Sequence, residues 1–222
     1  MLHDHGYSDV RIAALGVRAD RLSHFPTHLG LHRELNERFP AGFMVSIGQQ
    51  LPHKRVEVAI TTLHLLREVH RIPLGLVIVG AERLQHYSAA LRNLVHRLHL
   101  DNHVCFTGSV NDAELATYLR SSLCLLMTSD HEGFGIPPLE AMQELTPVIA
   151  KGVGAVPATV GAAGIVLPPK SGPCLFAESV ARLTRDPDLK DQLVLAGLRQ
   201  VDRLGSYDQS AEVADLLQGS LK

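Results

Sequence analysis

The sequence lacks any apolar run near the roughly 18 residues that a membrane-spanning helix needs. Its N-terminus also lacks the apolar core of a signal peptide, since His3, Asp4 and His5 interrupt the first residues. We therefore expect no transmembrane segment and a cytoplasmic location.

Cysteine is scarce, with three residues in 222, and no C-x-x-C spacing occurs. Cys105 and Cys124 lie inside apolar, strand-like runs, where a thiol behaves as a small hydrophobe. The 13 histidines include His96, His99 and His103, but no carboxylate or cysteine cluster accompanies them. The sequence therefore predicts neither a disulfide nor a metal site, and it favours surface histidines.

An excess of charge is absent too. The formal net charge is -2, and lysine and arginine are not concentrated in one block, which disfavours nucleic acid as a partner. A nicotinamide-binding domain would need a G-x-G-x-x-G turn after its first strand. The chain instead has Gly-Gln-Gln-Leu-Pro-His at residues 48–53, so we rank that function low.

The sequence does contain a regular alternation of two patterns after residue 42. Short apolar runs predict strands, and segments with helical spacing of apolar residues separate them. The expected strands are 43–47, 74–79, 104–106, 123–127, 146–150 and 164–167, and the expected helices are 54–71, 84–98, 112–119, one from Pro138, and most of 173–219. Such alternation predicts an α/β fold with a doubly wound parallel, Rossmann-like sheet around one core.

Residues 1–40 do not show this alternation. They read as a connector with a short strand at 10–15 and a short helix at 31–38, punctuated by glycine and proline. We therefore divide the chain into a connector, 1–40, and one domain, 41–222.

The most informative stretch links a strand, a glycine-bearing loop and a helix, from Leu123 to Leu145. Ligands bind at such junctions, because the helix N-terminus offers unpaired N–H groups and a positive dipole end. The prolines at 137 and 138 carry no N–H, so the candidate donors are Gly135, Ile136, Leu139 and Glu140. Glu132 and Glu140 flank the loop and are good acceptors for sugar hydroxyls. The plainer alternative is a capped helix in which Glu140 only complements the dipole.

A second candidate site follows the strand at 43–47. Lys54 and Arg55 come at the expected helix start, where they oppose the positive end of the dipole. A bound diphosphate would explain this placement, and Gly48 would let its oxygens approach the backbone. The alternative is that both cations extend into water.

A third motif, Asp186-Pro187-Asp188, has the D-x-D form of some metal sites. It lies between two expected helices, where Asp186 would cap and Pro187 would take the first helical position. We interpret it as a cap.

Glu132 and Glu140 are separated by seven residues with Gly-Phe-Gly between them. This resembles the E-x7-E signature of the retaining, nucleotide-sugar-dependent glycosyltransferases with the two-lobed GT-B fold, and the resemblance extends over residues 43–219. It implies that the chain is the donor-binding lobe. It implies catalytic roles for Lys54 and Glu132, the latter holding the transferred sugar, while Glu140 would hold the ribose hydroxyls. The implied donor-binding residues are Gly48, Gln49, Val110, Gly133, Phe134, Gly135, Ile136, Leu139 and Glu140.

The resemblance also implies an activity. A sugar would pass from a UDP-, GDP- or ADP-sugar to an acceptor hydroxyl without a metal or another cofactor. The acceptor, a glycan, lipid or small molecule, would bind an N-terminal lobe that residues 1–40 do not supply, and this lobe would also provide any peripheral contact with a membrane. Two alternatives stay open: a non-catalytic nucleotide-sugar-binding module, and a related enzyme such as an epimerase.

The chain departs from the family pattern at two positions. Gln49 stands where members commonly have arginine, so Lys54 is the cation retained from that pattern, and Arg55 is a candidate replacement for the missing charge. Ala158 follows Pro157 where the family usually has glutamate.

Overall fold

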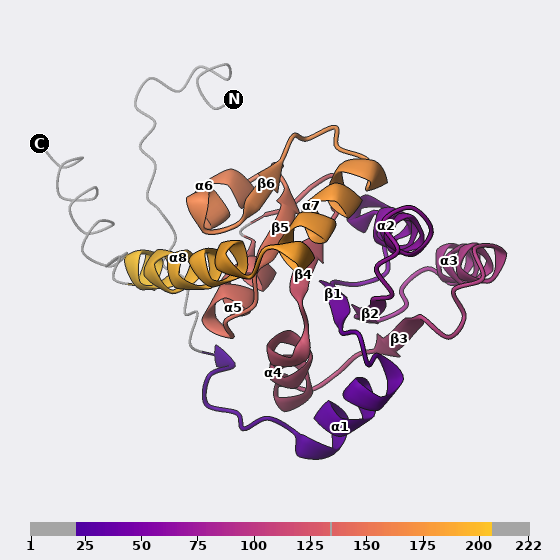
Figure 1. The fold of residues 1–222 in the computed structure, drawn as a ribbon, viewed down its shortest axis with the longest axis horizontal. Helices are drawn as coiled ribbons and strands as arrows, with labels where there is room; N and C mark the ends of the chain where they lie inside the picture. Colours follow the sequence, from indigo (N-terminus) through magenta and orange to yellow (C-terminus); the bar gives the residue numbers. More distant parts are fainter. Residues whose placement is uncertain (1–20, 134, 206–222) are drawn as a thin grey trace, which may run out of the picture.

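The computed structural model describes residues 21–133 and 135–205. Its centre is a six-stranded sheet in the order β3-β2-β1-β4-β5-β6, and every neighbouring pair is parallel (Figure 1). The strands are β1 Phe43–Ile47, β2 Gly75–Val79, β3 Val104–Gly108, β4 Cys124–Met127, β5 Val148–Lys151 and β6 Ile165–Leu167. The predicted doubly wound, Rossmann-like sheet is confirmed, with all six strands close to their expected positions.

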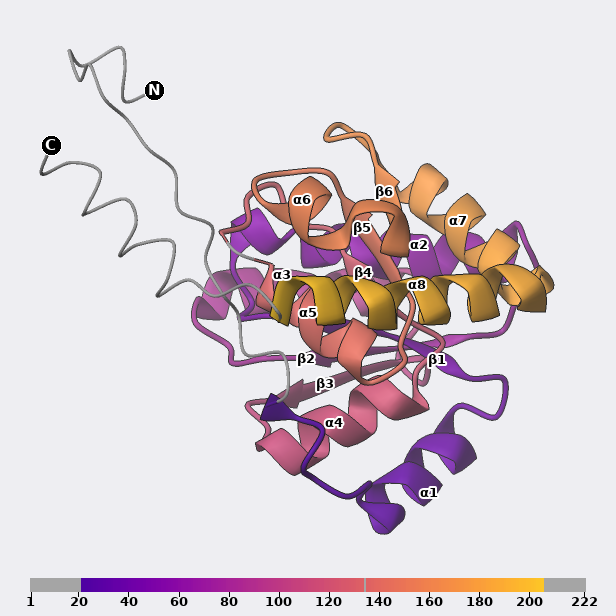
Figure 2. The ribbon, with the colours of Figure 1, turned by 90° about the vertical axis from the view of Figure 1, so that its left-hand side faces the viewer.

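Helices cover both faces of this sheet. They are α1 Leu29–Arg38, α2 Val56–Glu68, α3 Gln85–Arg97, α4 Asp112–Ser121, α5 Ile136–Gln143, α6 Val156–Val160, α7 Pro173–Arg185 and α8 Pro187–Gly205, with single 3-10 turns at Pro52–Lys54 and Gly161–Ala163. Buried residues of α2, α3 and α7 form one core cluster, and those of α1, α4, α5 and α6 form another. Figure 2 shows α1 and α4 below the strands.

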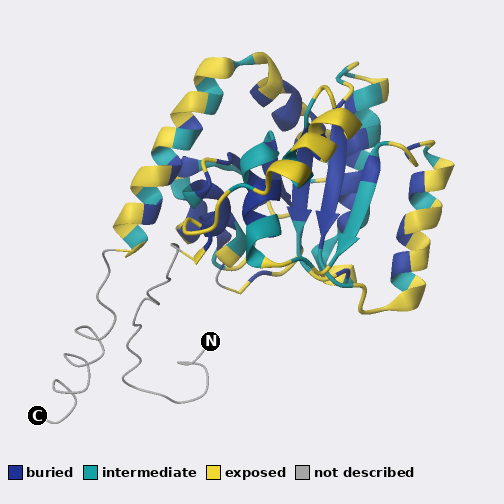
Figure 3. Cartoon of the chain, turned by 90° about the horizontal axis from the view of Figure 1, so that it is seen from below, coloured by how far each residue is buried: buried dark blue, intermediate teal, exposed yellow. Residues whose placement is uncertain are grey.

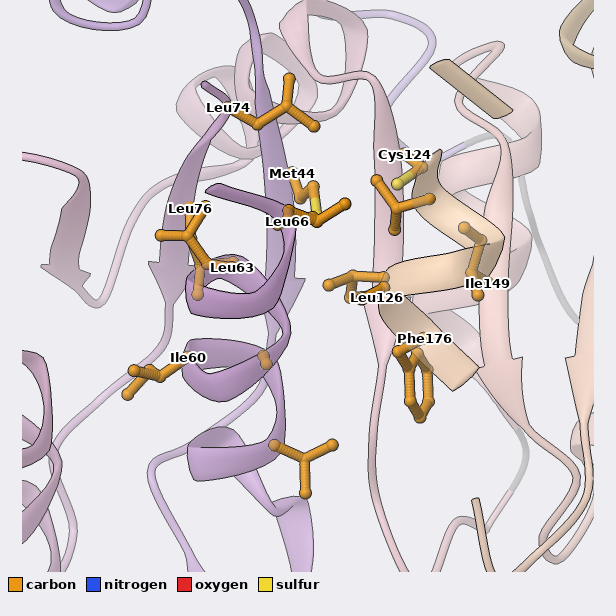
Figure 4. Packing of buried hydrophobic residues seen from close by; sticks show 14 of the residues in the cluster. Met44, Ile60, Leu63, Leu66, Leu74, Leu76, Cys124, Leu126, Ile149 and Phe176 are labelled. Carbon is orange, nitrogen blue, oxygen red and sulfur yellow. The ribbon is translucent and has the colours of Figure 1, made fainter. Parts of the chain in front are cut away.

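The strands divide their side chains between these clusters. In β1, Met44 belongs to the first cluster, whereas Phe43 and Val45 belong to the second, because alternate side chains of a strand point to opposite faces. Figure 4 shows Met44 and Leu126 among the residues packed beneath α2 and α7. A sheet buried on both faces needs the continuous apolar runs that the sequence has. In Figure 3 the central strands are accordingly buried and the outer faces of the helices exposed.

Two predicted helix starts are wrong. The predicted helix at 54–71 is divided by Arg55, which has left-handed backbone angles (φ 51°, ψ 44°), so Lys54 ends a 3-10 turn and α2 begins at Val56. The helix predicted from Pro138 begins at Ile136, after Gly135 in the left-handed conformation (φ 71°). In both places the chain turns sharply before the helix, which apolar periodicity does not reveal.

Part of the predicted connector packs against the domain. Leu22 is fully buried and belongs to the second core cluster together with Phe39. The Arg120 guanidinium donates to the carbonyl oxygens of Leu22 (3.4 Å) and Phe25 (2.6 Å) and pairs with Glu144. Residues 21–40 therefore belong to the same packed body as the sheet. The predicted strand at 10–15 and the segment 206–219 lie outside the described residues.

Asp186 and Pro187 behave as predicted. The Leu189 N–H donates to Asp186 Oδ1 at 2.9 Å, and Pro187 is the first residue of α8. Among the described residues, no helix has the length and apolar character needed to cross a membrane.

Candidate functional site

The candidate site lies at the carboxyl ends of β1 and β4. These strands are neighbours in space although β2 and β3 separate them in sequence, so the sheet changes its winding direction between them. In open α/β sheets ligands bind in the crevice at this switch point. The two candidate sites predicted from the sequence lie in the loops that follow β1 and β4.

Glycine is required where the loop after β1 passes the end of β2. A Cβ atom on Gly80, which has φ 143°, would lie 2.0 Å from the Gly48 carbonyl oxygen. Gly48 itself has φ 148°, and a Cβ there would meet the Lys54 side chain at 3.3 Å. The Lys54 side chain therefore lies against Gly48, directly after the end of β1.

Lys54 and Glu132 meet across the switch point. Lys54 Nζ donates to Glu132 Oε1 at 2.7 Å, with 21% of the lysine side chain and 8% of the glutamate side chain exposed. Burial of a carboxylate this deep requires a charged partner. The structure therefore brings together the two residues predicted to be catalytic, and pairs them with each other.

Arg55 is not free to replace the missing arginine at position 49. Its Nε donates to Glu57 Oε1 at 2.6 Å and its Nη1 to Asp130 Oδ2 at 2.8 Å. Both acceptors are carboxylates, so the guanidinium is already matched by negative charge. Gln49 is exposed, and Lys54 differs from Arg55 in that its carboxylate partner, Glu132, is itself a predicted site residue.

The N-terminus of α5 offers fewer N–H donors than predicted. The first four N–H groups of a helix have no intrahelical partner, and for α5 these belong to Gly135, Ile136 and two prolines that lack them. Leu139 stands where intrahelical bonding begins, and its side chain is buried in the second core cluster. Of the four candidate donors, Gly135 and Ile136 precede the first intrahelical bond, whereas Leu139 and Glu140 lie where such bonds have begun.

Glu140 is buried, with 4% of its surface exposed, and its carboxylate accepts from Arg21 Nη2 at 2.7 Å. Burial raises the pKa of Glu140 above its usual value, and the Arg21 guanidinium partly offsets that rise. Arg21 Nη1 also lies 3.5 Å from Asp112 at the start of α4. Arg21, from the segment before α1, thus pairs with Glu140, the second glutamate of the E-x7-E signature.

The remaining predicted site residues are spread along the same edge. Val110 follows β3, is half-buried, and packs against the second core cluster. Gly133 is exposed, and a Cβ there would meet nothing within 4 Å. Phe134 lies outside the described residues. Val110 thus stands two strands away from β1, whereas Gly133 lies in the same loop as Glu132.

Sequence reasoning missed three charged residues here: Asp130, Lys151 and Arg21. Lys151 Nζ donates to Asp130 Oδ1 at 2.7 Å, and the lysine side chain is 5% exposed. Lysine is almost never buried without a partner. A lysine at the end of an apolar strand is therefore a signal from which a buried ion pair could have been predicted. The described part of the chain holds no cluster of three His, Cys, Asp or Glu residues that could bind a metal ion.

Comparison with known proteins identifies the family. The sequence profile of "Glycosyl transferases group 1" matches residues 31–199. The chain belongs to this family. A GDP-mannose-dependent alpha-(1-6)-phosphatidylinositol monomannoside mannosyltransferase of Mycobacterium tuberculosis is 32% identical over 218 residues, which are 92% of this chain and 54% of that protein.

The alpha-1,3/1,6-mannosyltransferase ALG2 of Mus musculus is 29% identical over 201 residues, which are 83% of this chain and 47% of that protein. The chain thus spans about half the length of the curated relatives that it matches.

Solved structures share the fold. The C-terminal domain of a glycosyl transferase group 1 family protein (LpcC) from Francisella tularensis has a TM-score of 0.70 at 22% identity, covering 85% of this chain and 97% of that one. Anabaena Alr3699/HepE in complex with UDP-glucose has a TM-score of 0.72 at 20% identity, covering 94% of this chain and 57% of that one. At these identities the likeness is one of fold, and it confirms the Rossmann-like lobe expected of a GT-B glycosyltransferase.

Proposed function

We propose that this chain is the donor-binding lobe of a retaining glycosyltransferase and binds a nucleoside diphosphate sugar at the switch point between β1 and β4. The observation that carries the proposal is the 2.7 Å contact between Lys54 Nζ and Glu132 Oε1. It unites a cation suited to a diphosphate and a carboxylate suited to sugar hydroxyls, taken from the two strands between which ligands bind in this fold.

In the proposed complex Lys54 and Glu132 no longer contact each other, and each instead contacts a group of the ligand. Lys54 and the N–H groups of Gly135 and Ile136 would donate hydrogen bonds to the diphosphate. Glu132 would accept hydrogen bonds from hydroxyls of the transferred sugar. Glu140 would accept from the ribose hydroxyls in place of Arg21. The same cation and helix N-terminus would then stabilise the charge that develops on the leaving diphosphate.

Transfer would require more than this lobe. In the proposed mechanism the acceptor hydroxyl attacks on the face from which the diphosphate leaves, and an acceptor-binding lobe holds that hydroxyl in place. Closing two lobes around the substrates supplies the proximity that makes such a step fast. We therefore propose that residues 21–205 bind donor but do not by themselves position an acceptor.

The names of two similar proteins indicate which donors to test first. One relative is named for GDP-mannose and one structural neighbour contains UDP-glucose. GDP-mannose is therefore the first donor to test, with UDP- and ADP-sugars beside it.

Isothermal titration calorimetry with GDP, UDP and ADP, each with and without EDTA, tests the proposal. We expect at least one nucleoside diphosphate to bind equally well in EDTA, because Lys54 and the helix N-terminus supply the positive charge. Lys54→Met should weaken that binding, and Lys170→Met, which changes an exposed lysine after β6, should not. Failure of all three nucleotides to bind, or a requirement for magnesium, would overturn the proposal.

A further inference from the structure

Arg55 has an unfavourable backbone for a residue other than glycine. Its φ of 51° lies in the left-handed region, where a Cβ atom costs energy that glycine avoids. Arg71 shares this conformation (φ 57°), and its ion pair with Glu68 is long at 3.8 Å and exposed. Arg55 instead makes two short ion pairs. These contacts explain why arginine stands at a position whose backbone conformation favours glycine.

The partner that links Arg55 to the rest of the site is Asp130. One carboxylate oxygen accepts from Arg55 Nη1 at 2.8 Å and the other from Lys151 Nζ at 2.7 Å. Asp130 thus ties the loop after β1 to the end of β5. The hydrogen bond from Lys151 lowers the pKa of Asp130, and the one from Arg55 adds to that effect.

The carbonyl groups of residues 53–55 also contact the loop after β4. The Asp130 N–H donates to the His53 carbonyl oxygen at 2.8 Å. The Thr128 hydroxyl lies 3.0 Å from the carbonyl oxygens of both Lys54 and Arg55. Three consecutive carbonyl groups, 53 to 55, therefore face donors from Thr128 and Asp130 in the loop after β4.

We call the ion pairs of Asp130 with Arg55 and Lys151 the latch. Lys54 lies at the centre of the turn, residues 53–55, that the latch holds. Ordering a lysine on a ligand costs backbone as well as side-chain entropy, and a backbone that is already fixed removes the first of these two costs. The latch fixes the Lys54 backbone against the loop after β4. The same loop carries Glu132, two residues after Asp130. The distance between the diphosphate-binding and sugar-binding groups is thereby set by Asp130 and its two cations.

We infer that Asp130, held by Arg55 and Lys151, is a positioning residue that sets Lys54 for the donor diphosphate. The inference rests on the proposed function, because it gives Lys54 its ligand. Asp130 touches neither ligand nor reacting atoms in this assignment and acts through the backbone of residues 53–55.

A double-mutant cycle distinguishes this role from general support of the fold. Asp130→Asn keeps the backbone N–H and removes the charge that holds Arg55 and Lys151. We expect it to weaken nucleoside diphosphate binding about tenfold, within the range of coupling between residues of one hydrogen-bonded network. In the Lys54→Met background the same change should have little further effect, because the residue being positioned is gone. Equal losses in both backgrounds would overturn the inference.

A second variant guards against loss of folding. Arg55→Gly removes the latch and also relieves the left-handed strain, so we expect weaker nucleotide binding without a lower melting temperature. Arg71→Gly is the matched control, since it relieves the same strain 16 positions away in a turn that carries no site residue. Unchanged nucleotide affinity in Arg55→Gly would contradict the assignment.

A measurement without ligand separates this inference from the proposed function. We expect Asp130→Asn to speed amide hydrogen exchange at Lys54 and Arg55, whose N–H groups bond to Leu51 and Pro52 in this turn. Unchanged exchange there overturns the latch even if nucleotides bind. Faster exchange in a protein that binds no nucleoside diphosphate supports the latch and overturns its assigned purpose together with the proposed function.

Discussion

Lys54 Nζ lies 2.7 Å from Glu132 Oε1, so the two residues most central to the proposed donor site neutralise each other before any donor arrives. In the proposed complex this contact would be exchanged for contacts with the ligand. A nucleoside diphosphate alone would take Lys54 and leave a buried carboxylate without its partner, whereas an intact sugar nucleotide would satisfy both. Under the proposed assignment the pairing would therefore favour the complete donor over its product.

The first prediction separates these two ligands by changing Glu132. Glu132→Gln releases Lys54 from its carboxylate, so affinity for the nucleoside diphosphate should stay the same or rise. Affinity for the sugar nucleotide should fall by about 1.5–3 kcal/mol, the contribution of one hydrogen bond to a charged group. Calorimetry with both ligands measures the difference.

Glu140→Gln should behave differently, because Glu140 is assigned to the ribose that both ligands contain. Both affinities should then fall together, and Glu37→Gln, an exposed change on α1, should alter neither. Losses of the same size for both ligands in both site variants would contradict the division of roles.

A second prediction concerns Arg21, whose guanidinium lies on Glu140. If ribose hydroxyls replace that contact, Arg21→Gln should raise nucleoside diphosphate affinity by up to about fivefold, since an ion pair with an exposed partner contributes about 0.2–1 kcal/mol and the Arg21 side chain is 50% exposed. Arg97→Gln, on the exposed face of α3, is the control. A loss of affinity in Arg21→Gln would instead make Arg21 part of the nucleotide site.

A third prediction follows from the raised pKa of Glu140. A raised pKa means that the folded protein protonates this carboxyl before an exposed glutamate, so an interaction needing the ionised form is lost earlier as the pH falls. Nucleoside diphosphate affinity should therefore decline on acidification from pH 7, at pH values above the usual glutamate range. In Glu140→Gln that part of the pH dependence should disappear, while titration of the phosphate itself remains. Identical pH profiles for the two proteins would refute the assignment.

A fourth prediction concerns the backbone beneath Glu132. Gly154 has φ 55°, and a Cβ there would lie 2.0 Å from the Glu132 carbonyl oxygen. Gly154→Ala should therefore displace the loop and lower the free energy of unfolding by about 1–3 kcal/mol. Gly172→Ala is the control, because a Cβ there would meet nothing within 4 Å. Chemical denaturation of both variants measures the cost, and equal stability would show that the loop adapts freely.

The sequence sufficed for the sheet because its signal is local. Runs such as Leu123–Met127 are apolar on every residue, which is typical of strands buried on both faces. The spacing of Glu132 and Glu140 was likewise visible, and the structure brings the first of these to Lys54. Gly135 shows the limit: its left-handed turn starts α5 two residues before Pro138, and local periodicity carries no information about that turn.

The charged contacts could not be predicted for a different reason. Arg55, Asp130 and Lys151 come from three segments that meet only because β4 lies between β1 and β5. That strand order follows from how the whole sheet winds, and the sequence alone suggests parallel strands without fixing their neighbours. Arg21 is a similar case, since it reaches Glu140 from the segment before α1.

The most direct test is a crystal structure of this chain with the sugar nucleotide that binds best in calorimetry. The account predicts that Lys54 Nζ leaves Glu132 and lies within hydrogen-bonding distance of a diphosphate oxygen, with the Gly135 and Ile136 N–H groups on the same diphosphate and the sugar on Glu132. A donor bound elsewhere, or one bound here with the Lys54–Glu132 pair intact, would contradict it.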